Sequence, residues 1–340
     1  MIIMALLSFF TKLLHFLPAE LSHNIGLKSL NVIYKTGILK FLNHNNSIKE
    51  DIKEDGFTNH IFFSKFHSKL GIAAGLDKNG DFIDALSSLG VGFIEVGTVT
   101  PRPQEGNKKP RLFRDKTNSA LVNKMGFNNK GVDYLVRKVQ GRSSKIPLGI
   151  SIGKNFDTPI ALAYKDYQVC LEKVYEFADY IAVNISSPNT EKLRELSSKE
   201  YLDELLSKLK KVQLNKINHF GYKPLFVKIS PDELAKDIGE ICQCIKDNSI
   251  DGIICTNTSL NYEGNIGNGG VSGKPLMKTS TTVLEQVRGL MGEDFPIIAS
   301  GGVMCPSDFH TKIDAGANLV QIYTGFIYKG PKLISDIVSS

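Results

Sequence analysis

Side chains able to bind a small charged ligand recur where short apolar stretches of this sequence end. Asn184 ends one such stretch, Lys228 closes the next, and Lys78 closely follows the first. An asparagine amide presents two donors and one acceptor in a plane, and a lysine supplies positive charge. Several asparagines brought together would therefore suit a planar heterocycle with amide-like edges. The lysines would suit an anion, or negative charge that develops during a reaction.

The residue types missing from these positions exclude several kinds of chemistry. None of the seven histidines lies at the end of one of the eight predicted strands. A Ser-His-Asp hydrolase would therefore lack its base, and a zinc centre would lack its ligands. Asp77 is nearly alone among carboxylates there, which argues against a magnesium enzyme. The five cysteines lack C-x-x-C spacing, so we expect reduced thiols and no metal site.

Glycines follow the last two apolar stretches, at Gly301-Gly302 and at Gly325. Glycine lets a ligand approach the backbone closely, and N–H groups in such loops can hold a phosphate. Taken singly, each of these residues is more often a turn former. Taken together with the amides and lysines, they indicate a phosphate-bearing cofactor beside a small planar anion.

Eight short apolar stretches alternate with helical patterns from residue 69 onward. Such alternation predicts βαβ units and a parallel sheet. Eight units predict an α/β fold of the (β/α)8 TIM-barrel type, with its chemistry at the carboxyl ends of the strands. A doubly wound sheet is the alternative, because a strand count from one sequence can be off by one. The predicted strands are 70–75, 92–99, 147–154, 179–186, 224–230, 252–258, 296–302 and 319–325, with helices such as 199–214 between them and a last helix from residue 331.

The first 17 residues are strongly apolar except for one stripe. Ser8, Thr11, Lys12 and His15 recur at helical spacing, and Pro18 then interrupts the pattern before a second helical segment that reaches Gly37. The run is too short to span a membrane and lacks a signal-peptide cleavage site. It indicates an interfacial amphipathic helix, and simple packing of both helices on the main body is the alternative. We expect a helical domain over 1–42, a linker and lead-in over 43–68, and the barrel over 69–340.

The overall composition is that of an ordinary soluble domain. The chain has 340 residues, 42% hydrophobic and 22% charged, with a formal net charge of +6. These values exclude disordered and fibrous classes. The positive charge permits an anionic lipid surface or an anionic ligand, but it is too diffuse to indicate nucleic acid.

Ten segments of the sequence form motifs that occur together in one family. They are GIAAGLDKNG (71–80), EVGTVTPRPQEGNKKPRLFR (95–114), NKMGFNNKG (123–131), SIGKN (151–155), YIAVNISSPNT (180–190), FVKISPD (226–232), DGIICTNT (251–258), GGVSGKPL (269–276), ASGG (299–302) and LVQIYTGFIYKGP (319–331). In these segments the sequence resembles the class 2, membrane-associated, quinone-dependent dihydroorotate dehydrogenases. The resemblance covers almost the whole barrel, and the segments in combination are highly specific.

This resemblance implies one FMN per chain, which oxidises dihydroorotate to orotate in de novo pyrimidine (UMP) biosynthesis. The residues that would contact the FMN are Ala73, Ala74, Gly75, Leu76, Asp77, Thr98, Asn155, Asn184, Lys228, Thr256, Gly273, Gly302, Tyr323 and Thr324. Those that would hold or enclose the substrate are Lys78, Asn123, Lys124, Met125, Gly126, Phe127, Asn184, Asn189, Asn257 and Thr258.

The resemblance assigns the catalytic base to Ser187. Class 1 relatives use a cysteine there, and none of the five cysteines lies in 123–131 or 184–190. A serine is a poor base at neutral pH, so its proton must pass onward, with Thr190 and water as candidates. The neighbouring Ser186 and Ser187 could each be a plain turn residue before Pro188, and only the family resemblance separates them.

The N-terminal helices resemble the small domain that leads a membrane quinone to the flavin. His23 and Arg114 match positions lining that tunnel, with Tyr323 near its end. One departure is Lys69, where the family commonly has proline. The expected protein is a monomer, bound peripherally to anionic lipid on the cytoplasmic face of a bacterial cell membrane.

Three other functions stay open at this point. Another flavin barrel, such as a class 1 enzyme or a tRNA dihydrouridine synthase, would share the fold. A synthase should offer a cysteine acid and a basic RNA-binding face. A non-redox phosphate-binding lyase or isomerase would be colourless. A catalytically inactive membrane scaffold is disfavoured, because all the matched residues are present.

Overall fold

The computed structural model describes residues 2–39, 65–190, 193–262, 264 and 267–340. Most of the predicted linker, 43–68, and its boundary with the helical domain lie outside the described residues. The chain after it forms a closed barrel of eight parallel strands in the order β1-β11-β10-β8-β7-β6-β5-β2. Each predicted strand range contains one of them, so the predicted (β/α)8 barrel is confirmed. The strands are β1 (Leu70–Ile72), β2 (Phe93–Val99), β5 (Leu148–Ile152), β6 (Tyr180–Asn184), β7 (Leu225–Ile229), β8 (Gly252–Cys255), β10 (Ile297–Ser300) and β11 (Leu319–Ile322).

Aromatic rings fill the interior of the barrel. Phe93, Tyr180 and Phe226 are fully buried and meet edge to face. Glycines on neighbouring strands make room for them: a Cβ added at Gly149 would lie 2.1 Å from the Tyr180 ring, and one at Gly252 would lie 2.2 Å from that of Phe226. The barrel is therefore a packed core whose usable space lies at its ends.

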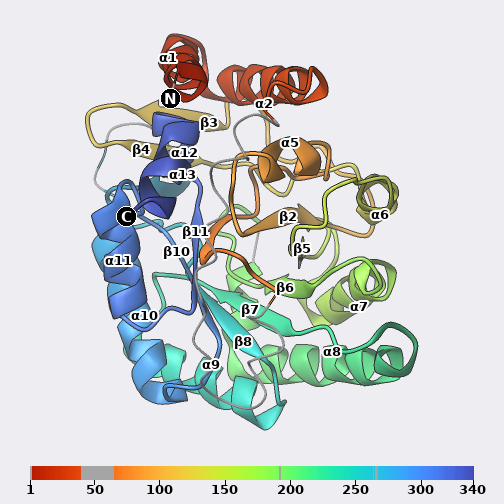
Figure 1. Ribbon diagram of the computed structural model, residues 1–340. Helices are drawn as coiled ribbons and strands as arrows, with labels where there is room; N and C mark the ends of the chain where they lie inside the picture. Colours follow the sequence, from red (N-terminus) through yellow and green to blue (C-terminus); the bar gives the residue numbers. More distant parts are fainter. Residues whose placement is uncertain (1, 40–64, 191–192, 263, 265–266) are drawn as a thin grey trace.

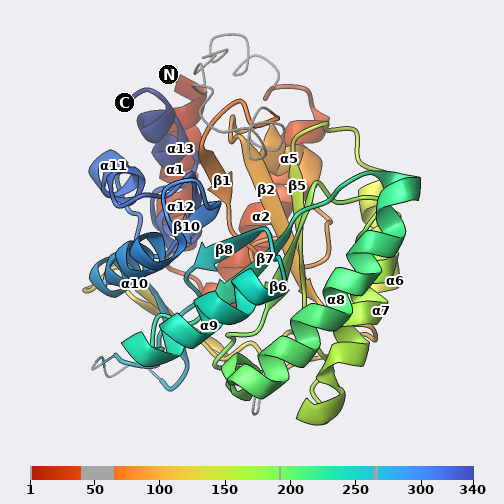
Figure 2. The same cartoon turned by 90° about the horizontal axis from the view of Figure 1, so that it is seen from below.

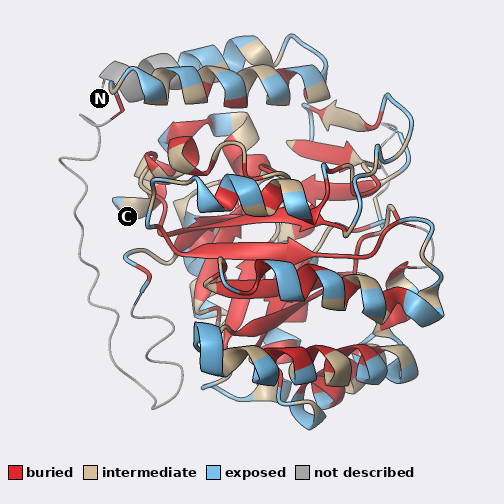
Figure 3. Cartoon of the chain, turned by 90° about the vertical axis from the view of Figure 1, so that its right-hand side faces the viewer, coloured by how far each residue is buried: buried red, intermediate tan, exposed pale blue. Residues whose placement is uncertain are grey.

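Helices surround the strands and bury only their inner faces (Figures 2 and 3). In α8 the buried residues include Leu202, Leu205 and Leu209, which recur at the spacing of one helical face. This helix extends past the predicted residue 214 and ends at Gly221, whose φ of 74° is favourable only for glycine. The helices are α5 (Ile83–Ser87), α6 (Val132–Gln140), α7 (Ala163–Val174), α8 (Lys199–Phe220), α9 (Ala235–Asp247), α10 (Leu276–Met291), α11 (Pro306–Asp314), α12 (Thr324–Lys329) and α13 (Pro331–Val338), with 3-10 turns at Ile160–Leu162 and Leu193–Ser197.

Two local predictions were wrong. The last predicted strand, 319–325, ends at Ile322, and helix α12 begins at Thr324. The long segment after β2, for which the sequence predicts no strand, contains two strands, β3 (Leu112–Asp115) and β4 (Ala120–Asn123). These strands form an antiparallel sheet with β9 (Gly270–Gly273), which comes from a distant part of the chain.

The predicted N-terminal pair of helices is present as α1 (Ile2–Leu14) and α2 (Ala19–Lys35) (Figure 1). Helix α1 contacts α12 and α13, and α2 contacts α5 and β3. Large apolar side chains nevertheless face outward, with Phe9 61% and Phe16 81% exposed. Among the described residues, no helix is long and apolar enough to cross a membrane.

Candidate active site

An open cavity, with about 970 Å³ of space including the solvent at its mouth, lies at the carboxyl ends of the barrel strands. Most of the predicted site residues line it. They are Ala73, Ala74, Gly75, Lys78, Thr98, Asn123, Met125, Gly126, Phe127, Asn184, Ser187, Asn189, Lys228, Thr256, Asn257, Thr258, Gly273, Gly302, Tyr323 and Thr324.

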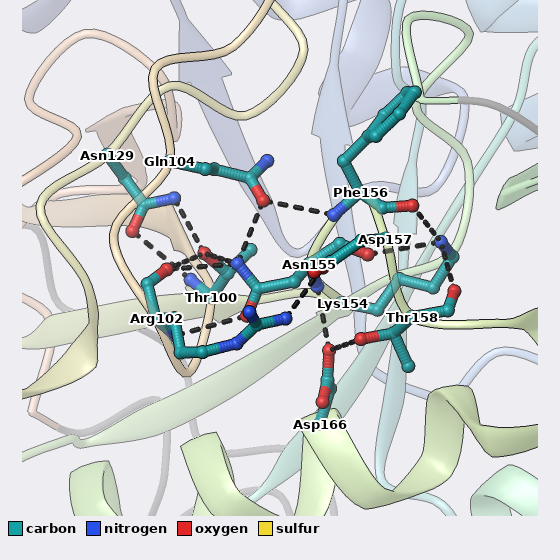
Figure 4. Close-up of polar contacts among 10 residues, drawn as sticks. All are labelled: Thr100, Arg102, Gln104, Asn129, Lys154, Asn155, Phe156, Asp157, Thr158 and Asp166. Carbon is teal, nitrogen blue, oxygen red and sulfur yellow. Dashed lines mark hydrogen bonds and ion pairs between the residues drawn. The ribbon is translucent and has the colours of Figure 1, made fainter.

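Asn155 is not among the residues that line the cavity. Its side-chain amide donates to the Thr100 hydroxyl, to the Arg102 carbonyl and to Gln104 Oε1, at 3.2, 3.0 and 2.9 Å (Figure 4). Its Oδ1 accepts the Arg102 backbone N–H at 3.1 Å. Asn155 therefore ties the loop after β5 to the loop after β2, and its contact with a flavin stays a prediction.

Three other predicted residues also lie outside the lining. The Asp77 carboxylate accepts the backbone N–H groups of Asp81 at 3.0 Å and Phe82 at 2.7 Å, so it holds the turn that leads into α5. Burial raises the pKa of Asp77 to about 6. Leu76 lines a second cavity, described below. The Lys124 ammonium lies over the ring of Phe113, 5.7 Å from its centroid.

Lys228 is held by a carboxylate that the motif analysis did not single out. Glu95 on β2 is fully buried, and its Oε1 lies 3.7 Å from Lys228 Nζ. Its Oε2 accepts hydrogen bonds from the Tyr180 hydroxyl at 2.9 Å and Gln321 Nε2 at 2.7 Å. A glutamate inside an apolar strand was the available signal, because a buried charge needs a partner.

The amide side chains of the cavity are oriented by one another. Asn257 Nδ2 donates to Asn184 Oδ1 at 3.1 Å, and Asn184 Nδ2 donates to the Thr98 hydroxyl at 2.8 Å. On the facing loops, Asn189 Nδ2 donates to Asn123 Oδ1 at 2.9 Å. A network of this kind fixes each amide before a ligand arrives.

Ser186 and Ser187 differ in what their hydroxyl groups contact. The Ser186 hydroxyl donates to the Lys228 carbonyl at 2.6 Å and accepts Asn257 Nδ2 at 3.0 Å, and Ser186 is not among the residues that line the cavity. Ser187 lines the cavity, and among the described residues its hydroxyl accepts one long contact, from the Asn189 N–H at 3.4 Å. Thr190, three residues on, has a buried hydroxyl with no hydrogen-bond partner among the described residues. Ser187 therefore has a hydroxyl available to a ligand, whereas that of Ser186 is used within the protein.

A second, mainly apolar cavity of about 680 Å³ lies between the N-terminal helices and the barrel. His23, Arg114 and Leu76 line it, together with Phe326 of α12. Burial and the nearby Lys78 lower the pKa of His23 to about 4, so its ring is neutral at pH 7. The Arg114 guanidinium donates to the carbonyls of His15 and Leu17, which close the end of α1.

These features define a (β/α)8 barrel with a polar ligand site at its strand ends and an apolar cavity beside it. Known proteins similar to this chain agree with that class. A family model described as dihydroorotate dehydrogenase matches residues 57–340. A "dihydroorotate dehydrogenase (quinone)" of a Shewanella species is 45% identical over 336 residues, 97% of each chain, and one of Coxiella burnetii is 47% identical over 285 residues, 82% of each. The crystal structure of DHODH in complex with ferulenol from Eimeria tenella superposes with a TM-score of 0.78 at 30% identity, covering 94% of this chain and 89% of that one. The chain belongs to the dihydroorotate dehydrogenase family.

Proposed function

We propose that this protein oxidises dihydroorotate to orotate with FMN as hydride acceptor and a membrane quinone as final electron acceptor, in pyrimidine biosynthesis. The single observation that carries the proposal is the pairing of the two cavities. The polar cavity is lined by Ser187, Lys228 and the oriented asparagines. Gly75 also lines the polar cavity, and the next residue in the sequence, Leu76, lines the apolar cavity. The curated relatives named as quinone enzymes support the same reading.

The residues of the polar cavity fit a flavin. Small residues and backbone form one wall at Ala73, Ala74 and Gly75, where a flat ring could lie. The buried Oε1 of Gln321 faces this cavity without a hydrogen-bond partner among the described residues, so it offers an acceptor to a bound donor. Lys228 adds a cation within the protein interior. When bound, FMN supplies the hydride acceptor.

The remaining residues bind the substrate and move its proton. The Lys78 ammonium, which donates to the Gly75 carbonyl at 3.1 Å, would pair with the orotate carboxylate. The amides of Asn123, Asn184 and Asn257 would hold the ring edge. The Ser187 hydroxyl would take the C5 proton and pass its own toward the Thr190 hydroxyl, which has no hydrogen-bond partner among the described residues, in a site bordered by the 123–127 loop.

The outward face of the N-terminal helices supports binding to a membrane surface. Phe9, Leu13 and Phe16 are exposed beside the cations of Lys12 and Lys116, and Lys116 lies over the Phe16 ring at 5.4 Å. The polar residues Thr11 and His15 face the second cavity instead. We infer a monomer lying on anionic lipid at the cytoplasmic face of the cell membrane, with the apolar cavity receiving the quinone.

The visible spectrum of the purified protein tests this function. We expect a yellow protein that releases FMN on denaturation, loses its colour with dihydroorotate under anaerobic conditions, and regains it with a soluble quinone. A colourless protein that does not bind FMN would refute the proposal and favour a non-redox barrel. A yellow protein that dihydroorotate does not bleach would favour another flavin barrel.

A further inference from the structure

The segment before β3 contacts helix α2 on one side and the substrate loops on the other. Its Arg111 is 7% exposed. The guanidinium binds the carboxylate of Glu20 on α2, with Nη2 2.9 Å from Oε1. Its Nη1 donates to the carbonyls of Glu105 at 2.6 Å and Asn107 at 3.0 Å. One buried cation thus joins α2 to the turn at 105–107.

Asn107 continues this connection into both loops that cover the substrate. Its Nδ2 donates to the carbonyl of Lys124 at 3.0 Å and to that of Asn189 at 3.3 Å. Its backbone N–H donates to the Met125 carbonyl at 3.1 Å. One amide therefore holds the loop 123–127 and the loop 187–190 together, next to Ser187 and the Asn123–Asn189 pair.

The same cluster surrounds the substrate-binding lysine with charge. Lys78 is faced by Glu20 and His23 from α2, by Arg111 from the segment before β3, and by Asp77 from its own loop. Burial and Arg111 lower the pKa of Lys78, Glu20 and Asp77 oppose them, and the result is about 8. The Glu20 carboxylate therefore helps to keep this lysine charged at neutral pH.

We propose that Glu20, acting through Arg111 and Asn107, is a positioning residue for the dihydroorotate side of the site, so that docking of helix α2 sets the geometry of the two substrate loops. Helix α2, which borders the apolar cavity, then also supports the polar cavity. This inference rests on the proposed function for its substrate, but the hydrogen-bond path from α2 to the loops does not depend on it.

The test uses the full-length, flavin-loaded protein with Glu20→Gln, Asn107→Ala and the double variant. Each single variant should weaken orotate and dihydroorotate binding about 5- to 30-fold, as expected for the loss of one or two buried, charge-assisted or loop-holding hydrogen bonds. Because both act on one path, the double variant should lose less than the product of the two. The rate at which a soluble quinone reoxidises the flavin should fall by a smaller factor than the affinity for the substrate.

Two further readouts distinguish positioning from a general loss of stability. Amide hydrogen exchange should quicken in 120–131 and 186–190 in Glu20→Gln, while the barrel strands stay protected. The pH above which orotate affinity falls should shift down in Glu20→Gln, because Lys78 loses a charge that favours its protonated form. The matched control is Lys109→Gln, which removes an exposed partner 3.6 Å from Glu20 without touching the loops, and it should change neither readout.

Unchanged substrate affinity and unchanged loop exchange in both single variants would overturn the inference, as would fully multiplicative losses in the double variant. If dihydroorotate fails to reduce the unmodified protein, the proposed function is wrong instead. The exchange measurement still decides the coupling between α2 and the loops in that case.

Discussion

The hydroxyl groups of Ser186 and Ser187 show how position within a few ångströms decides a residue's role. The sequence alone could not separate these neighbours, because both precede Pro188 in the same turn. In the structure, the Ser186 hydroxyl donates to the Lys228 carbonyl of β7, whereas Ser187 lines the cavity. Asn155, which the family resemblance assigns to the flavin, bonds to the loop after β2 in this structure. Residue type and strand-end position predict which residues gather near the site, but not which way each side chain turns.

At the residue scale, Ser187→Ala should keep the flavin bound and slow its reduction by dihydroorotate about 10²- to 10⁴-fold, the usual range for losing a positioned general base. Rapid-mixing absorbance under anaerobic conditions measures the reduction. Ser186→Ala is the comparison and should slow reduction less, since its hydroxyl contacts the Lys228 carbonyl and Asn257 Nδ2 and acts on the substrate only through that amide. A Ser187→Ala protein that is reduced at the normal rate would exclude Ser187 as the base.

At the scale of elements, the local pattern predicts the barrel strands well and the small sheet badly. Each barrel strand is a short apolar run, so its own residues reveal it. Strand β3 is only partly buried, β9 has the sequence Gly-Val-Ser-Gly, and the pairing of β4 with β9 joins segments about 150 residues apart. Such strands depend on long-range pairing that no local window contains. The sheet matters because Asn123 ends β4 and donates to the Gly270 carbonyl of β9 at 3.0 Å, which anchors the start of the substrate loop.

The prediction at this scale concerns the turn that leads into α5, which the Asp77 carboxylate holds. Asp77→Ala removes the acceptor for the Asp81 and Phe82 amides and leaves these N–H groups without it, so the free energy of unfolding should fall by about 1–3 kcal/mol. Urea unfolding followed by circular dichroism measures the change. Asp157→Ala is the control, because Asp157 is 65% exposed and forms a surface ion pair with the exposed Arg102, and it should scarcely alter stability. Equal stability of the Asp77 variant and the unmodified protein would contradict the assigned role.

At the scale of the whole molecule, the closed barrel and the N-terminal helical pair follow from the sequence, since both rest on repeated local patterns. The sequence does not show which face of each N-terminal helix points outward. Apolar residues occupy most of α1, and only packing against α12 and α13 decides that Thr11 and His15 turn inward and Phe9 and Phe16 outward.

This outward face predicts binding to vesicles of anionic phospholipid. The double variant Phe9→Ser/Phe16→Ser should lose most of its co-sedimentation with such vesicles, while dihydroorotate still reduces its flavin at the normal rate. Both side chains are exposed, so the fold should tolerate the change. Leu214→Ser, an exposed apolar site on α8, is the control and should sediment with the vesicles as the unmodified protein does. Undiminished binding of the double variant would locate the lipid contact elsewhere.

The boundary between the two cavities is only one residue wide along the chain. Gly75 lines the polar cavity and Leu76 the apolar one, and the same step occurs from Gly325 to Phe326. A charged acid and an apolar quinone can therefore bind on opposite sides of this boundary, each in a cavity of matching polarity.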